Sequence, residues 1–445
     1  MKKYFIRFFL GILFIYISTI CFGLEVSLKY EKYTQETQKF RPVGRLFAEK
    51  LTECPKGNWK LPQLKSALPI YSTVKLGNIQ RLVIIDREKA EDNFYNLVYF
   101  DSNANNDLTD DPPIMGKIEA QAENFINLTF PNIDTKVEIS GKLLPYNITP
   151  YMYGYGLNLK SGITKDNIKQ NIYIYFMLGC CYSGQFEIAG QKYLVSLADS
   201  NVNGYFDERL SLPAELPSFS PSTVLYPSGD NLYITTNQEI GYYDGETLSD
   251  KIFLAGDLYD LEINIPESKM TLTPLKENLV ALKLPMGTDR LTIYCEDTKK
   301  SIMSYHSEKE IKVPKGKYRL IGYQLLQKDQ KGDEWRLEAS ATKDAILANA
   351  DGTPDSQLIF GEPFIPKVTV PDWAMQNFKA GGNSIQLALN IEGACREQVS
   401  DLAHQSGNLT DIPLSTRNKM RPKEATFKIM KPDGTIVHQG TFEYG

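Results

Sequence analysis

Two short segments of the sequence place oxygen-bearing side chains at alternate positions. The first, DSNANNDLTDD, runs from Asp101 to Asp111, and the second, DSNVNGYFDE, runs from Asp199 to Glu208. Ca²⁺ takes about six to eight oxygen ligands in flexible geometry, so a short loop with side-chain oxygens at positions 1, 3 and 5 and a backbone carbonyl at position 7 can surround the ion. The spacing therefore predicts a calcium site in each segment.

The candidate calcium ligands occupy the same positions in both loops. Position 6 must turn sharply with a positive φ, a conformation that Gly204 adopts freely and that Asn106 tolerates better than most residues. In the first loop the candidate ligands are Asp101, Asn103, Asn105 and Asp107, with Asp110 or Asp111 as the distal ligand. In the second loop they are Asp199, Asn201, Asn203 and Tyr205, with Asp207 or Glu208 as the distal ligand.

This alternation resembles the D-x-D-x-D-G calcium loops of dockerins, thrombospondin type 3 repeats and EF-hands. The resemblance covers only the loops themselves, so it implies a ligand and no particular fold. Position 12, which is glutamate in EF-hands, is Pro112 or Leu210 here, and asparagine replaces aspartate at positions 3 and 5. Both departures imply a weak structural site of the extracellular kind, with a Kd on the order of 0.1 to 1 mM.

Ordinary turn chemistry offers a second interpretation of the same residues. Asn, Asp and Gly form hairpin turns without any metal, because their side chains cap backbone amides and accept left-handed conformations. The recurrence of the pattern favours calcium, since Asp199 lies 98 residues after Asp101 (199 minus 101) with the same alternation. Such an internal repeat predicts either two related β units or one β unit with a duplicated hairpin.

The elements that position these loops are predicted to be strands. Apolar, strand-like runs precede each loop, NLVYF before Asp101 and KYLVSLA before Asp199. Period-two alternation dominates the chain, turn signals recur every ten or so residues, and long stretches of helical period are missing. Tight turns are expected at VPKG (313–316) and KPDG (431–434). We predict a mostly β, multidomain protein of antiparallel, β-sandwich-like units with little helix.

Composition divides the chain into five segments. About 420 residues beyond the leader exceed the size at which one core stops growing, so several domains are expected. A short helix is expected from Arg45 to Thr52, within the first segment after the leader. The expected segments are a signal peptide (1–23), a polar lead-in (24–55), a β region with both acidic loops (56–270), a β-sandwich-like domain (271–360) and a C-terminal Ig-like β domain (361–445).

The first 23 residues indicate export. A basic start, an apolar run shorter than the roughly 20 residues of a membrane span, and small-residue spacing predict a cleavable Sec-type signal cut near Gly23. Cys21 would suggest a lipoprotein, but Ile20 stands where a small residue should precede it. Without the leader, 49 minus 3 basic residues face 54 acids, a net charge of −8. This acidity argues against nucleic acid and anionic lipid as partners and suits a cation.

Five cysteines follow the leader, an odd number that leaves at least one thiol unpaired. An exported chain permits disulfides, and one member of the adjacent pair Cys180 and Cys181 could bridge to Cys54. The alternative is that the pair forms two buried small apolar side chains. The remaining cysteines are Cys295 and Cys395.

The sequence lacks the motifs of common enzyme classes. It contains no H-E-x-x-H, no G-x-S-x-G and no phosphate-binding glycine loop. Its histidines are far apart, at His306, His404 and His438, and the alternation around His438 predicts a structural residue on a strand face. We therefore predict no enzymatic activity. A hydrolase with a carboxylate pair stays open as an alternative, because acids are abundant and only the tertiary structure pairs them.

A tyrosine ladder offers a route to carbohydrate binding. In PYMYGYGLNL the alternate residues Tyr151, Tyr153 and Tyr155 share one face of a strand. Exposed phenol rings form flat platforms for sugars, whereas buried rings would indicate a packed cross-strand cluster. The exposure of the three rings distinguishes the two interpretations.

The layout of the chain is similar to that of a group of uncharacterised exported bacterial proteins, built from β domains with D-x-N-x-N-G loops and ending in a strand like GTFEYG. That resemblance implies no activity and agrees with a scaffold or binding role. We expect a secreted or periplasmic, non-enzymatic calcium-binding β protein with a structural, adhesive or surface-binding role. A cell-surface glycan or protein is the expected partner class, with carbohydrate binding through the tyrosines as the main alternative.

Overall fold

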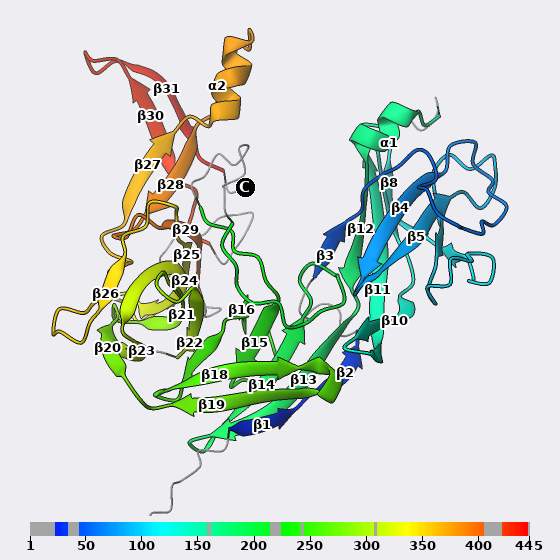
Figure 1. The fold of residues 1–445 in the computed structure, drawn as a ribbon. Coiled ribbons are helices and arrows are strands. Elements are labelled where there is room, and N and C mark those ends of the chain that lie inside the picture. The colour runs from blue at the N-terminus through cyan, green and yellow to red at the C-terminus, as the bar shows by residue number, and fades with distance from the viewer. Residues whose placement is uncertain are drawn as a thin grey trace, which may run out of the picture.

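The computed structural model describes most of the chain. The described residues are 23–33, 44–157, 162–213, 224–241, 244–306, 309–404 and 421–443. Residues 1–22, which include Cys21 and most of the segment expected to be a signal peptide, lie outside them. The described chain is mostly β with antiparallel sheets (Figure 1), which confirms the predicted fold class. The exception to antiparallel pairing is β17 with β22, which run parallel.

A twelve-stranded sheet extends across most of the described chain. Its order is β1-β19-β18-β17-β22-β21-β24-β25-β29-β28-β27, with β26 paired to β24. The strands are β1 (Leu24–Ser27), β17 (Lys251–Leu254), β18 (Asp257–Asn264), β19 (Lys269–Leu275), β21 (Thr288–Cys295), β22 (Lys300–Tyr305), β24 (Gly316–Lys328), β25 (Glu334–Ser340), β26 (Ala348–Ala350), β27 (Ile365–Thr369), β28 (Ala388–Glu392) and β29 (Gln398–His404).

Three smaller sheets carry the acidic loops and their neighbours. The six-stranded sheet contains β3 (Arg45–Phe47), β8 (Lys117–Ala122), β9 (Phe125–Thr129), β10 (Ile133–Ile139), β11 (Lys142–Tyr155) and β12 (Ile172–Leu178). The five-stranded sheet contains β2 (Lys29–Lys32), β13 (Cys180–Ile188), β14 (Gln191–Ala198), β15 (Asn231–Thr235) and β16 (Gly245–Thr247). The four-stranded sheet contains β4 (Ile70–Leu76), β5 (Ile79–Asp86), β6 (Leu97–Phe100) and β7 (Ile114–Met115).

A two-stranded sheet, one hairpin and a few short helices complete the described structure. The tight turn predicted at KPDG is confirmed, because it joins the paired strands β30 and β31. VPKG also joins two strands, β23 and β24, but these lie in different sheets and only Lys315 separates them, so the tight turn predicted there is wrong. No helix of the described residues is long and apolar enough to cross a membrane. The elements are β20 (Leu279–Lys283) paired with β23 (Glu310–Pro314), β30 (Thr426–Met430) paired with β31 (Ile436–Thr441), α1 (Lys165–Asn171), α2 (Asp372–Lys379) and the 3-10 turn η3 (Ile265–Glu267).

The segment expected as a polar lead-in supplies one strand to each of three sheets. β1 pairs with β19, β2 with β13 and β3 with β12. The short helix expected from Arg45 to Thr52 is wrong, since Arg45–Phe47 forms β3 and Leu51 bridges to Tyr71. The unpaired backbone groups at the edge of β12 offer hydrogen bonds that outweigh a weak local helix propensity.

Three apolar clusters stabilise the fold. The largest extends from Val26 to Tyr305 and is shared by all four sheets. The second extends from Leu225 to Cys395 and packs the twelve-stranded sheet against the two-stranded sheet of β20 and β23. The third contains four buried residues, Tyr71, Leu82, Ile84 and Leu108. The two large clusters agree with the expectation that a chain of this length needs more than one core.

The cysteines act as packing residues. The five cysteines within the described residues form no disulfide, so the considered bridge to Cys54 is not formed. Cys180 and Cys181 point to opposite faces of β13 and are both 0% exposed. Each therefore packs as a small apolar side chain, because both faces of this strand are covered.

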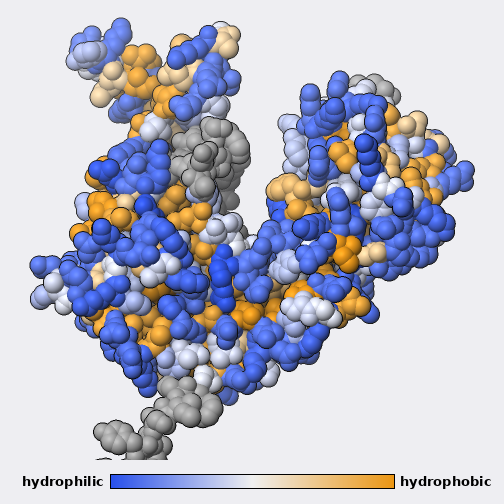
Figure 2. All heavy atoms as spheres, in the orientation of Figure 1, coloured by the Kyte–Doolittle hydropathy of each residue, from blue (hydrophilic) through white to orange (hydrophobic). Residues whose placement is uncertain are grey.

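Two arms rise from a common base in Figure 1. The six- and four-stranded sheets form one arm, the strands from β20 onward form the other, and β1, β13, β14, β18 and β19 form the base. The space-filling view in Figure 2 shows a mainly hydrophilic face that is hollowed between the arms. Both acidic loops belong to the part of the chain that forms the base and the first arm.

Candidate metal centres

Each acidic loop leaves an inner strand of its sheet. The first loop follows β6, which lies between β5 and β7, and the second follows β14, which lies between β13 and β15. The strand predicted before each loop is confirmed. The two loops therefore occupy equivalent places, each connecting an inner strand to its next antiparallel neighbour.

The aspartate at position 1 is buried in both loops. Asp101 and Asp199 are each 0% exposed, although both carry a carboxyl group. Each side chain accepts hydrogen bonds from the backbone N–H groups at positions 5 and 6, which closes the loop around it. The distances are 3.1 Å from Asn105 and 3.1 Å from Asn106 in the first loop, and 3.2 Å from Asn203 and 2.6 Å from Gly204 in the second.

Both loops adopt left-handed backbone conformations at the same two positions. Position 4 has φ of 61° at Ala104 and 57° at Val202, and position 6 has φ of 66° at Asn106 and 95° at Gly204. A positive φ is rare for a β-branched residue such as valine, which shows that the surroundings impose this backbone. Two different sequences thus fold into the same loop.

The distal acid at position 10 converges with the asparagines at positions 3 and 5. This geometry selects Asp110 and Glu208 from the two pairs of distal candidates. The amide nitrogens of Asn103 and Asn105 lie 3.4 and 2.7 Å from Asp110 Oδ2, and those of Asn201 and Asn203 lie 2.7 and 2.9 Å from Glu208 Oε2.

The other two distal candidates lie elsewhere. Asp111 is nearly buried and accepts hydrogen bonds from the backbone N–H and the hydroxyl group of Ser102. Asp207 is exposed. Asp111 therefore supports the start of the first loop from outside the group at positions 3, 5 and 10.

The residues at position 7 differ in their side chains. Asp107 forms an ion pair with Lys60 at 2.6 Å, and the hydrogen bond from Lys60 lowers the pKa of Asp107 to about 2. The Tyr205 hydroxyl group donates to Asn78 Oδ1 at 3.3 Å. Because position 7 was expected to contribute its backbone carbonyl, these side-chain contacts are compatible with the predicted ligand set.

Asp230 supports the second loop and was missed by the sequence pattern. It is 0% exposed and accepts hydrogen bonds from the backbone N–H groups of Ser200 (3.0 Å) and Glu208 (2.9 Å), so it joins the two ends of the loop. Asp230 immediately precedes β15, far from the loop in sequence. The acid in SGDNLYIT was the available signal, but nothing local connects it to the loop.

Two buried carboxyl groups meet beneath the second loop. Burial raises the pKa of Asp199 to about 6. Burial, followed by the charge of Asp199, raises the pKa of Asp230 to about 8. In the first loop, burial raises the pKa of Asp111. A raised carboxyl pKa means that the charged form is poorly stabilised, and a nearby cation would offset that cost.

The side-chain chemistry of both loops fits calcium better than a softer metal. The asparagine oxygens at positions 3 and 5 accept hydrogen bonds from the backbone N–H groups two residues on. Rotation of each amide about χ2 would exchange these contacts for two amide oxygens beside the distal carboxylate. The donors would then be carboxylate, amide and backbone oxygens, the set that Ca²⁺ prefers. Within the described ranges, no group of three or more His, Cys, Asp or Glu side chains is arranged for a metal ion. The low acid count agrees with a weak site.

The tyrosine ladder lies on an aromatic face of the six-stranded sheet. We define this aromatic face by Phe47, Tyr151, Tyr153, Tyr155, Tyr173 and Tyr175. Tyr153 stacks on Tyr173 with ring centroids 4.7 Å apart. Tyr151 and Tyr153 are half-buried, whereas Tyr155 is 62% exposed. The rings are therefore both a packed cross-strand cluster and a partly exposed platform.

The histidines lie in separate parts of the structure. His306 contacts Asp289 with Nδ1 2.8 Å from Oδ1, His404 packs edge-on against Trp335, and His438 is exposed beside Phe427. None of these contacts joins two of the histidines.

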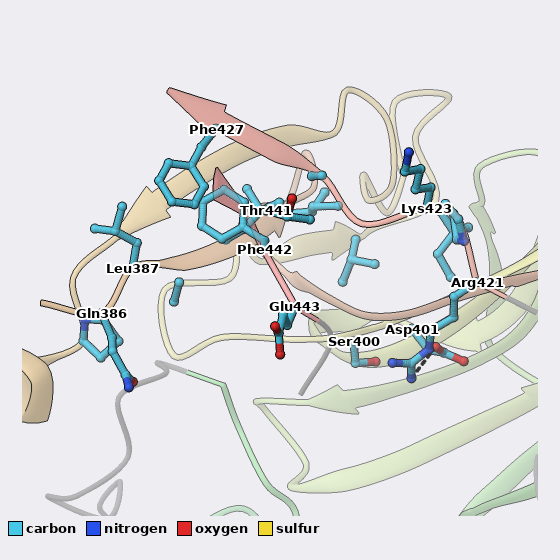
Figure 3. A pocket seen from close by; sticks show the side chains of 18 of the residues that line it. Gln386, Leu387, Ser400, Asp401, Arg421, Lys423, Phe427, Thr441, Phe442 and Glu443 are labelled. Carbon is cyan, nitrogen blue, oxygen red and sulfur yellow. Dashed lines mark ion pairs between the residues drawn. The ribbon is translucent and has the colours of Figure 1, made fainter. Parts of the chain in front are cut away.

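A cavity of about 810 Å³ lies beside β28, β29 and the β30–β31 hairpin. Figure 3 shows the rings of Phe427 and Phe442 in its middle and the ion pair of Arg421 with Asp401, at 2.9 Å, toward one end. Its lining is mainly apolar, so it suits an apolar group better than a charged ligand.

Comparison of the chain with protein-family models, with curated proteins and with solved structures found no match. Function is therefore inferred from the geometry of the loops and of the other surfaces.

Proposed function

We propose that the two acidic loops bind calcium and that the chain is an exported β protein stiffened by this ion. One observation supports the proposal most strongly. Loops of different sequence share a buried first aspartate, left-handed residues at positions 4 and 6, and two asparagines that converge on an acid at position 10. Turn formation alone requires no acid at position 10, whereas a cation site does.

The ligand set would be equivalent in the two loops. The ion would be held by the aspartate at position 1, the amide oxygens at positions 3 and 5, the backbone carbonyl at position 7 and the acid at position 10. In the second loop these residues are Asp199, Asn201, Asn203, Tyr205 and Glu208. Calcium would supply positive charge where the chain places poorly stabilised carboxylates.

The second loop gives the ion a mechanical role. Its Asn203 carbonyl accepts a hydrogen bond of 2.6 Å from the backbone N–H of Gly77, in the turn between β4 and β5. The Tyr205 hydroxyl group reaches Asn78 in the same turn. An ordered second loop therefore holds the four-stranded sheet against the five-stranded sheet. This supports a scaffold role more directly than a catalytic one.

Thermal unfolding in EDTA and in excess calcium, with magnesium as the control ion, tests the proposal. With a Kd on the order of 0.1 to 1 mM, about 10 mM calcium should stabilise the fold by about 1.4 to 2.7 kcal/mol per site. Glu208→Gln should remove most of this gain, and the adjacent exposed Asp207→Asn is the matched control. An equal response of both variants to calcium, or no calcium-specific rise in Tm, would show that both loops are ordinary turns.

The aromatic face is a second candidate site, for glycans. Phe47 is 63% exposed and Tyr155 62%, and the Arg45 guanidinium lies 4.7 Å from the centroid of the Tyr175 ring. Such rings offer flat apolar surfaces with polar tips to sugar rings. Tyr155→Ala should abolish retention on an immobilised glycan and leave Tm nearly unchanged. Tyr226→Ala, at an exposed position outside this face, is the control.

A further inference from the structure

A polar cavity lies where the five-stranded sheet meets the twelve-stranded sheet. Strands β15 and β16 line one side of it, and β24, β25 and β29 line the other. Figure 1 shows these strands where the second arm joins the base. The volume of the cavity is about 360 Å³. Sites for small ligands typically enclose roughly 300 to 1,000 Å³, so the cavity is large enough for a small organic molecule.

A glycine and its neighbours in the large sheet form the floor of the cavity. Gly322 on β24 pairs with Thr292 on one side and with Ser340 on the other. Two residues further along β24, Gln324 pairs with Glu338. Residues two apart in a strand share a face of the sheet, and so do residues paired across strands. Polar side chains therefore surround the space above Gly322, which has no side chain to fill it.

Two carboxyl groups line the cavity. Glu246, on β16, accepts a hydrogen bond of 3.1 Å from the Thr292 hydroxyl group. Glu338, on β25, has Oε1 3.1 Å from Arg336 Nε. An ionised carboxylate offers about four acceptor sites, so one such contact leaves most of them available. Both glutamates are half-buried and line the cavity, so a ligand inside it can reach them.

The amide oxygen of Gln324 is a further acceptor at the cavity. Gln324 is 6% exposed and belongs to the lining. Its Nε2 donates to Asp289 Oδ2 at 2.9 Å, and because a carboxylate only accepts, this contact fixes the orientation of the amide. Asp289 lies outside the lining, so the amide oxygen is the end directed at the cavity, where it has no donor among the described residues. A buried acceptor without a donor indicates a hydrogen-bond donor from outside the chain.

The negative charge at the cavity is incompletely compensated. Among the described residues that line it, none is Lys, Arg or His. Arg336 lies 3.1 Å from Glu338 and donates to Asp401 at 3.1 Å, so one guanidinium serves two carboxylates. Burial raises the pKa of Glu246 and of Glu338, although the charges of Arg290 and Arg336 respectively act in the opposite direction. Carboxylates in such surroundings favour a cation beside them.

The cavity suits an organic cation better than a metal ion. Ca²⁺ draws its oxygen ligands to about 2.3 to 2.6 Å, which leaves little space around the ion. Tyr233 adds an aromatic side chain to the lining. Its ring lies against Gly245, where a Cβ would come within 2.5 Å of it. An aromatic ring attracts a cation and also packs against an apolar stem.

We propose that this cavity binds a small aliphatic amine in its protonated form. An ammonium group has three N–H donors and no acceptor, which matches the acceptors of Glu246, Glu338 and the Gln324 amide. A ligand carboxylate would be repelled by the two glutamates, and a neutral hydroxyl group would form weaker hydrogen bonds with them. The inference is independent of the calcium proposal, because the cavity and the loops share no residue.

Saturation-transfer NMR and calorimetric titration of the whole chain in EDTA test the assignment, at about pH 7, where an aliphatic amine is protonated. The probes are butylamine and putrescine, with 1-butanol and butyrate as the neutral and anionic controls. An amine should bind saturably and about tenfold or more tightly than 1-butanol, because its hydrogen bonds are charge-assisted. Glu338→Gln should weaken amine affinity about tenfold. Glu310→Gln, at an exposed position of β23, is the matched control and should bind like the native chain.

Ser340→Phe is a second variant, which should fill the cavity and abolish amine binding. Should Glu338→Gln fail to fold, Ser340→Phe alone decides the location.

Four results would overturn the assignment. They are no saturable binding of either amine at about 10 mM, the weak end of useful affinities, equal binding of 1-butanol, amine binding that survives both variants, and displacement of the amine by calcium when EDTA is left out. The last result would assign the cavity to a metal ion. The two proposals fail separately, since amine binding should persist in EDTA, where the calcium effect on Tm is absent.

Discussion

The two acidic loops share a backbone conformation but differ in the residues that surround them. The first is anchored by Leu108 in a cluster of four buried residues, whereas the second inserts Val202 and Phe206 into the largest core. The first is also held by Arg81, whose guanidinium donates to the Asp101 carbonyl at 3.1 Å. The first loop thus has its buried carboxyl groups, Asp101 and Asp111, beside Arg81, whereas Asp199 and Asp230 form the buried pair beneath the second loop.

This difference shows that the loop sequence determines where the ligand side chains lie, while the surrounding residues determine the pKa of the carboxyl groups. Arg81 is a fixed cation close to the carboxyl groups of Asp101 and Asp111. Burial raises the pKa of Asp199 to about 6, and burial together with the charge of Asp199 raises the pKa of Asp230 to about 8. We therefore expect the second loop to depend more strongly on an external cation than the first.

The largest expected effect is the loss of the buried aspartate at position 1. Asp199→Ala leaves the Gly204 N–H and the Tyr146 hydroxyl group, each 2.6 Å away, without their acceptor and leaves the Asn203 N–H with only Asn201 Oδ1. It should reduce the free energy of unfolding by about 3 kcal/mol. Asp101→Ala should cost about 2 kcal/mol, because its loop lies beside a smaller core. Urea unfolding in EDTA measures both, and equal losses would remove the distinction between the loops.

The carboxyl pair beneath the second loop should make stability depend on pH. Both folded-state pKa values are raised above about 3.9, the unfolded value. The unfolded chain therefore ionises first, and the free energy of unfolding in EDTA should fall by a few kcal/mol as pH rises from about 4 to about 8.

Asp230→Asn tests the origin of this pH dependence, because it removes the group with the higher pKa. The variant should lose most of the decline between about pH 6 and 8. Asp111→Asn in the first loop is the comparison and should change the profile less. A flat profile for the native chain would contradict the assigned electrostatics.

A side chain at position 6 of the second loop should be costly. Gly204 has φ of 95°, and a Cβ there would lie 2.8 Å from Val137 Cγ1 and 3.0 Å from the Gly77 nitrogen. Gly204→Ala should lower the free energy of unfolding by about 2 kcal/mol and weaken the contact with the β4–β5 turn. Hydrogen exchange at the Gly77 amide would report that contact. Unchanged protection would show that the loop does not hold the sheets together.

The smallest expected effect is a gain in the first loop. Asn106 has φ of 66°, so Asn106→Gly relieves a left-handed conformation at an exposed position. The free energy of unfolding should rise by roughly 0.5 kcal/mol, because asparagine already tolerates this region. A larger rise in Tm with calcium in this variant would show that glycine at position 6 makes the first loop behave more like the second. Differential scanning calorimetry with and without calcium measures this rise.

Much of the local structure was predictable from alternation and turn residues. The strands before both loops, the tight turn at KPDG and the low helix content follow from short-range patterns. The helix expected from Arg45 to Thr52 was wrong, because pairing with β12 decided that segment. The choice between Asp110 and Asp111, or between Asp207 and Glu208, also needed the folded loop.

The sequence by itself determined the β class of the chain and which residues could supply oxygen ligands, since side-chain type and alternation act over a few neighbouring residues. Only the tertiary structure placed Asp230 beneath the second loop and aligned Arg290, Gln324 and Glu338 across separate strands. Strand order and register bring these groups together over long distances in the chain, and burial then changes their pKa. Neither effect is encoded in any local stretch of residues.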